Sequence, residues 1–155
     1  MPGVPPVGPP PASRGGPELL AGTFAPAGMR RAVEWCDGFA CFNHGADAHT
    51  VEEHFRLAAE AWKAGGHAGT PRVVGSCYLA VGPKAAEGKA AFLEKHYEHL
   101  SAEGRSRIDS AIGQAGDEAA RRAAKVYSNS GYDELVFVPM IPTVDQVHRL
   151  LDLRL

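Results

Sequence analysis

Short apolar runs alternate with amphipathic helical patterns along this 155-residue chain, and this alternation limits the fold more than any other feature. Strands are predicted at residues 19–21, 39–42, 72–81 and 134–138, and at least one helical pattern follows each of them. Strands that alternate with helices are typical of parallel sheets built from βα units. The chain is therefore expected to be an α/β protein, as part of a barrel or as a small open sheet.

Apolar spacing places the predicted helices at residues 26–36, 51–64, 83–100, 117–127 and 144–153. In the first of these, Met29, Ala32, Val33 and Cys36 form an apolar stripe at helical spacing. In the last, we expect Val147, Leu150 and Leu151 to face inward. The polar region 101–116 leaves room for one further short helix. The dense apolar run at 72–81 predicts a strand buried on both faces.

Residues 1–17 differ from the rest, because they contain seven of the twelve prolines and no periodic apolar pattern. Such a composition predicts an extended, poorly ordered lead-in or part of a long loop. The folded domain is expected to span residues 18–155.

Charge and cysteine content exclude several classes of protein. The formal net charge is −2 and no basic patch stands out, so neither nucleic acid nor an anionic membrane is an expected partner. Three cysteines without Cys-x-x-Cys spacing indicate reduced thiols and not a disulfide framework or a zinc ribbon. With no membrane-spanning run and no leader-like N-terminus, we expect a cytoplasmic protein.

The turn after the first predicted strand has features of a phosphate site. Gly22 leaves room for close approach of a ligand, and a helix start with free amides follows it. Thr23 is a candidate helix cap, and Pro26 suits the first helical position. The alternative is an ordinary βα connection, in which Gly22 only turns the chain and Thr23 only caps.

Several segments, in order, resemble the luciferase-like flavin-dependent monooxygenases. The resemblance begins with Leu-Leu-Ala-Gly-Thr-Phe-Ala-Pro-Ala-Gly-Met-Arg-Arg-Ala at 19–32 and Cys-Asp-Gly-Phe at 36–39. It continues through Ala61-Trp62, Gly65-Gly66, Pro71-Arg72-Val73-Val74, Ala80-Val81-Gly82-Pro83, the segment 131–139 and the segment 145–150. It covers the chain from about residue 18 to the end, although no single motif is decisive.

The resemblance implies the C-terminal half, about four βα units, of a (β/α)8 TIM barrel. Such proteins are oxidoreductases or monooxygenases that bind FMN or a deazaflavin coenzyme and act on small organic substrates with molecular oxygen or a hydride. By the resemblance, Gly22, Thr23 and Phe24 contact the cofactor phosphate. A half barrel has two unpaired edges, so the implied partner is the missing N-terminal half or a second copy of the chain.

No catalytic residue is assigned from the sequence, because flavin enzymes leave the electron chemistry to the cofactor. Phe42 is interpreted as core packing and His44 as a surface-loop histidine. No metal site is expected, since the seven histidines form no zinc-type cluster, and Cys77 in an apolar strand is expected to be inert packing.

Two rival functions stay open at this point. One is a non-catalytic remnant or interaction subunit that keeps the βα units without a complete site. The other is a small open-sheet protein that binds a different phosphate ligand.

Overall fold

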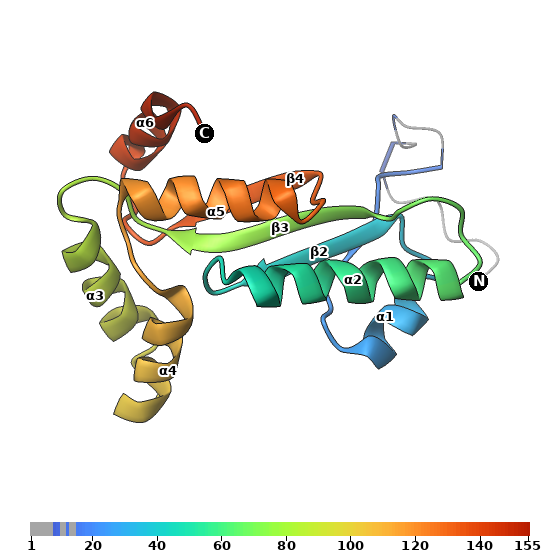
Figure 1. Ribbon diagram of the computed structural model, residues 1–155, viewed down its shortest axis with the longest axis horizontal. Helices are drawn as coiled ribbons and strands as arrows, with labels where there is room; N and C mark the ends of the chain where they lie inside the picture. Colours follow the sequence, from blue (N-terminus) through green and yellow to red (C-terminus); the bar gives the residue numbers. More distant parts are fainter. Residues whose placement is uncertain (1–7, 10–11, 13–14) are drawn as a thin grey trace.

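The structure is a computed structural model that describes residues 8–9, 12 and 15–155. Most of the expected lead-in, residues 1–17, lies outside these described residues. The described residues form four strands and six helices (Figure 1): β1 (Leu20–Ala21), α1 (Pro26–Ala32), β2 (Gly38–Asn43), α2 (Ala48–Ala64), β3 (Arg72–Leu79), α3 (Ala85–His96), α4 (Ala102–Ile112), α5 (Asp117–Asn129), β4 (Glu134–Pro139) and α6 (Val144–Leu153).

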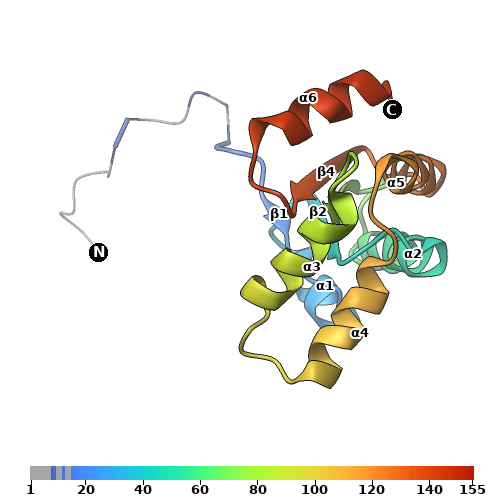
Figure 2. The ribbon, with the colours of Figure 1, turned by 90° about the vertical axis from the view of Figure 1, so that its left-hand side faces the viewer.

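All four strands are parallel and lie side by side in the order β1-β2-β3-β4, which confirms the expected α/β fold of four βα units. Because crossovers between parallel strands share one hand, a sequential order keeps the helices on one face of the sheet. Figure 2 shows α1, α2, α5 and α6 in turn around one side of the sheet. This is the arrangement of half a (β/α)8 barrel, and it differs from the reversing order of a doubly wound sheet.

The main core lies between the sheet and the helices α1, α2 and α5. Phe39 and Cys41 of β2 and Val73 and Cys77 of β3 are buried there. They pack with side chains from these helices that include Met29, Ala32, Val51, Ala58 and Tyr127. The buried apolar stripe expected on the first helix is confirmed, although the helix itself ends at Ala32.

The opposite face of the sheet has no layer of helices over it. Along β3 buried residues alternate with half-buried ones, and Val74, Ser76 and Tyr78 are half-buried. The expectation that this strand is buried on both faces was therefore wrong. Its apolar density reflects two different environments, one under the helices and one on the uncovered face.

Helix α6 also differs from expectation, because its apolar stripe faces away from the protein. Val147 and Leu151 are exposed and Leu150 is half-buried. The buried side chain is Gln146, whose amide accepts from the Val81 N–H (2.9 Å) and donates to the Val81 carbonyl (3.1 Å). Val81 lies past the end of β3, so its backbone N–H and carbonyl have no strand partner there. They need a polar side chain such as Gln146, which an apolar residue of α6 could not replace.

The region 101–116 contains a helix of eleven residues, α4. The Ser101 side chain caps α4 by accepting from the Gly104 N–H at 3.1 Å. The preceding helix, expected to reach residue 100, is shorter and ends at His96. Helices α3 and α4 pack together through Leu93 and Ile112 and stand at the carboxyl end of the sheet (Figure 1).

None of the helices in the described part of the chain is long and apolar enough to cross a lipid bilayer.

Asp47 caps α2, and its removal is expected to destabilise the protein. The carboxylate accepts from the Thr50 N–H (2.9 Å) and the Thr50 hydroxyl (2.8 Å), and these bonds lower the pKa of Asp47. Asp47→Ala should cost about 1 kcal/mol at neutral pH. Because the folded pKa lies below the ordinary value, this contribution is present above that value and disappears as the pH falls through the folded pKa.

Urea unfolding of both proteins at neutral and acidic pH, followed by circular dichroism, measures this difference. Asp47→Asn is the matched control, since an asparagine caps without titrating. An Asp47→Ala penalty that is the same at both pH values would contradict the assignment.

Gly45 allows α4 to pack against the turn after β2, and an alanine there should destabilise the protein. A Cβ at Gly45 would overlap the backbone carbonyl oxygens of Ala111 and Ile112, and backbone cannot yield as a side chain does. We expect Gly45→Ala to cost about 1–3 kcal/mol. Gly22→Ala is the control, since a Cβ at Gly22 meets nothing within 4 Å, and equal unfolding midpoints for the two variants would refute the packing argument.

Candidate functional site

The largest hollow at the carboxyl end of the sheet lies at the ends of β1 and β2, next to α4. Ligands bind at this end of parallel strands in barrels and open α/β sheets, because the βα loops gather there. The hollow has a volume of about 670 Å³. It is lined by Phe24, Phe42, Asn43, His44, Gly45, Asp47, Thr50, His54, Ser110 and Ala111.

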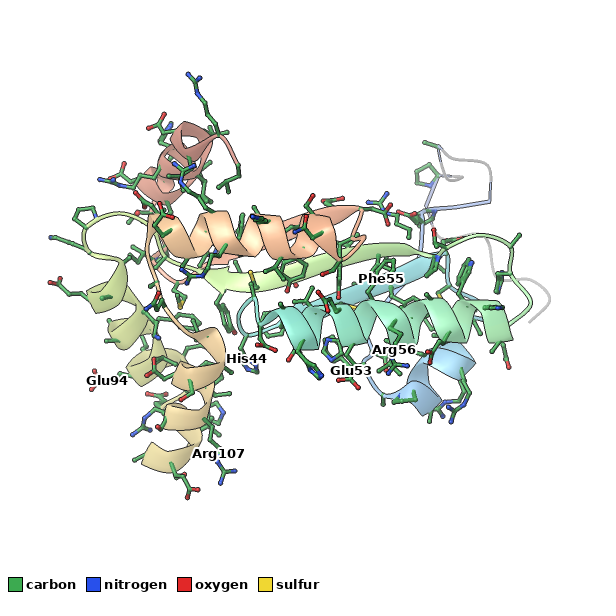
Figure 3. All side chains as sticks on the ribbon, viewed as in Figure 1. His44, Glu53, Phe55, Arg56, Glu94 and Arg107 are labelled. Carbon is green, nitrogen blue, oxygen red and sulfur yellow. The ribbon has the colours of Figure 1, made fainter. Side chains whose placement is uncertain are left out.

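His44 is a lining residue of this central hollow and not the surface-loop histidine expected from the sequence. Its ring lies 5.5 Å from the ring of Phe42 and 6.2 Å from that of Tyr78, measured between ring centroids. Figure 3 places His44 between the start of α2 and α4. Burial lowers the pKa of His44, so its imidazole is neutral near pH 7 and carries one donor and one acceptor nitrogen.

Two phenol groups lie beside this histidine. The hydroxyls of Tyr78, on β3, and Tyr97, after α3, are 3.0 Å apart and share a hydrogen bond. Burial, and then the neighbouring Tyr78, raises the pKa of Tyr97, so the Tyr97 phenol stays protonated at neutral pH. A bonded pair of phenols has one O–H free to donate to a further polar group.

Phe24 forms another wall of the central hollow by stacking on a histidine. Its ring lies 4.7 Å from that of His54 on α2, with 28° between the ring planes. The buried Nδ1 of His54 has no hydrogen-bond partner among the described residues. Burial lowers the pKa of His54, which keeps this imidazole neutral.

The three residues predicted to hold a phosphate do not share one hollow. Gly22 and Thr23 line a second hollow of about 500 Å³ along β1 and α1, whereas Phe24 points into the central one. Thr23 does not cap α1, because the N-cap is Ala25 and its side chain makes no capping bond. The Thr23 hydroxyl lies against Gly28 instead, where a Cβ would overlap it, while Pro26 does begin the helix as expected.

The turn nevertheless fits an anionic group. Gly22 is exposed, its φ is not positive, and a Cβ built on it meets nothing within 4 Å, so the fold itself does not need a glycine there. Within residues 15–155, the N–H groups of Gly22 and Phe24 donate to no backbone carbonyl, while that of Thr23 donates to Ala21 at 3.2 Å. Free amides beside a glycine are suited to a phosphate oxygen.

The cysteines and the possible metal-binding side chains do not add a reactive group to this site. Burial raises the pKa of Cys41 to about 11 and that of Cys77 to about 12, so neither thiol is a nucleophile at neutral pH. No group of three or more metal-binding side chains comes together in the part of the chain that the structure describes.

Sequence reasoning missed the lining residues His44 and His54, and the neighbouring pair Tyr78 and Tyr97. His44 directly follows Asn43 at the carboxyl end of β2, and that position is the signal that sequence reasoning gave too little weight. Tyr78 and Tyr97 meet only because α3 folds back beside β3, which local patterns do not reveal.

Comparisons with known proteins relate this fold to solved structures. No protein-family model matches the sequence, and no curated protein matches it. An F420-dependent secondary alcohol dehydrogenase, solved with an F420-acetone adduct, is similar with a TM-score of 0.61 and 13% identity, over 83% of this chain and 44% of that one. The apo form of MsnO8 is similar with a TM-score of 0.57 and 15% identity, over 92% of this chain and 51% of that one.

These likenesses show the fold, and the chain spans about half the length of the solved structures it matches.

Proposed function

We propose that this chain is the C-terminal half of a luciferase-like oxidoreductase or monooxygenase barrel and supplies the contacts to a cofactor phosphate. The observation that carries the proposal is the Gly22 turn at the end of β1. The fold does not require a glycine at this position, and the free amides beside it can donate to an anion in the open space. The order of family-like segments from residue 18 onward and the fold likeness to an F420-dependent enzyme support it.

The proposed cofactor is a deazaflavin of the F420 type, with FMN as the other candidate. The likeness to a structure that holds an F420-acetone adduct favours the deazaflavin. Such a cofactor supplies hydride transfer when bound. Of the predicted residues Gly22, Thr23 and Phe24, the free backbone amides of Gly22 and Phe24 would hold its phosphate, with Thr23 between them.

The central hollow would receive the reacting part of a small organic substrate. Phe24, Phe42 and the His54 ring exclude water from it by their apolar faces. The neutral His44 would offer a hydrogen bond to a carbonyl or hydroxyl oxygen and orient it, and the paired phenols of Tyr78 and Tyr97 lie beside this histidine. In this scheme the protein orients the substrate and supplies polar groups to its oxygen, and the cofactor supplies the hydride transfer.

Four further βα units are needed to cover the sheet and complete the site, as a separate half barrel or as a second copy of the chain. The proposed setting is the cytoplasm, because three free buried cysteines suit a reducing compartment. The substrate class proposed is a small alcohol, carbonyl or similar organic compound.

Titration of the purified chain with F420 and with FMN, followed by cofactor fluorescence, tests the proposal. The titrations are done with the chain alone and with a supplied N-terminal half barrel. We expect F420 to bind, and Gly22→Val to weaken binding by about tenfold or more, because the added methyl groups occupy the phosphate position. The unfolding temperature should stay close to that of the wild type, since a Cβ at Gly22 has open space around it.

Ala27→Val is the matched control, an exposed position one helical turn away that should leave affinity unchanged. Equal affinities of wild type and Gly22→Val would remove the phosphate site from the turn. Binding of neither cofactor under either condition would overturn the oxidoreductase proposal and support a non-catalytic interaction subunit.

A further inference from the structure

The uncovered face of the sheet has the composition of a barrel interior and not of a surface. Its side chains are Leu20 of β1, Ala40 and Phe42 of β2, Val74, Ser76 and Tyr78 of β3, and Val136 and Val138 of β4. Barrels fill their interior with three layers of four side chains, and four strands supply about half of that set. Water-facing sheets instead alternate apolar with charged or polar residues.

Charge on this face is confined to the amino ends of the strands. Arg72 bonds Glu134 at 2.8 Å and lies 3.4 Å from Glu18. Arg72 and Glu134 begin β3 and β4 and Glu18 lies just before β1, so these ion pairs gather at one end of the face. The middle of the face is left apolar, with Ser76 as its polar exception.

The helices α1, α2, α5 and α6 cover one face of the sheet (Figure 2), and the last of them, α6, carries an exposed apolar stripe. Leu150 and Leu153 pack toward Val81 and Ala120, and Arg121 of α5 bonds the Leu153 carbonyl at 2.9 Å. The opposite side of α6 presents Val144, Val147 and Leu151, and Leu151 is 70% exposed. We call these three residues the α6 stripe, and it faces the place where the next helix of a barrel ring would lie.

The other edge, at β1 and α1, also ends in exposed apolar side chains. α1 packs against α2 on one side. Trp35 (58% exposed) lines the hollow that runs along β1 and α1, and Leu19, directly before β1, is 48% exposed. We call Leu19 and Trp35 the α1 edge, and the hollow beside it is open to receive another element.

We propose that a second copy of this chain completes the barrel, with the α6 stripe of each copy on the α1 edge of the other. A two-fold axis parallel to the strands brings β4 of one copy beside β1 of its partner in parallel orientation, twice. The ring closes with eight strands, no free edge and both apolar faces buried.

This proposal rests on the two edges of the sheet and does not depend on the identity of the cofactor. It predicts two equivalent Gly22 turns in one barrel, one from each copy. Each copy carries both edges, so the α6 stripe of either copy can pack on the α1 edge of the other. Occupancy by any single helix would bury only one edge and leave the apolar face uncovered.

Light scattering after size exclusion measures the mass of the 155-residue chain, which should be twice that of one copy. Val147→Asp with Leu151→Asp disables the α6 stripe, and Leu19→Asp with Trp35→Asp disables the α1 edge. Each double variant should be monomeric with an unchanged circular dichroism spectrum, because all four positions are exposed. Lys63→Asp with Lys125→Asp, on the exposed sides of α2 and α5, is the control that should remain a dimer.

Mixing the two double variants distinguishes the proposed ring from other dimers. A mixed pair keeps one intact seam, between the unaltered α6 stripe of one copy and the unaltered α1 edge of the other. Native mass spectrometry should therefore detect a heterodimer, while each variant alone stays monomeric. If a double variant does not fold, the single variants Leu151→Ser and Trp35→Ser replace it.

A monomeric wild-type chain would overturn the proposal. So would a dimer that persists with the α1 edge disabled, because that result would mean that two α6 stripes pair with each other. Failure to bind F420 has no bearing on this outcome, and a monomer that binds F420 would refute the second copy while leaving the proposed function in place.

Discussion

Four parallel strands in sequential order form a sheet that has helices on one face only, and most other features follow from this constraint. Among the described residues, the uncovered face is apolar, both edges lack a partner strand, and exposed apolar side chains border both edges. The polar anchoring of α6 through Gln146 fixes that helix in place while its apolar stripe faces outward. An isolated sheet of this kind leaves its hydrogen-bonding edges free, and a closed ring of eight strands removes them.

The candidate site depends on the same arrangement, because parallel strands bring the loops after β1 and β2 to one end of the sheet. There Phe24 meets His54 from α2, and His44 meets Tyr78 from β3. Both histidines are kept neutral by burial, and the phenols share one hydrogen bond. The site is therefore rich in uncharged hydrogen-bonding groups around an apolar hollow, which suits orientation of a small polar oxygen more than acid–base chemistry by a charged residue.

The elements themselves were largely predictable from the sequence, and the relations between them were less so. Helical spacing located Met29, Ala32, Val33 and Cys36 in the core, and Pro26 marked a helix start. The α6 prediction failed because periodicity identifies an apolar stripe but not whether a neighbour covers it. Thr23 failed as a cap because it lies two positions before the N-cap Ala25. The pairing of Tyr78 with Tyr97 depends on the position of α3.

Amide hydrogen exchange at the edge of the sheet tests the closed barrel most directly. Alternate β4 amides face β3, and the others, apart from Pro139, which has no N–H, face the edge that a partner strand would occupy. If the barrel is closed, both sets should be protected to a similar degree in the native chain. Rapid exchange of the edge-facing amides, with protection only of those that face β3, would contradict the account.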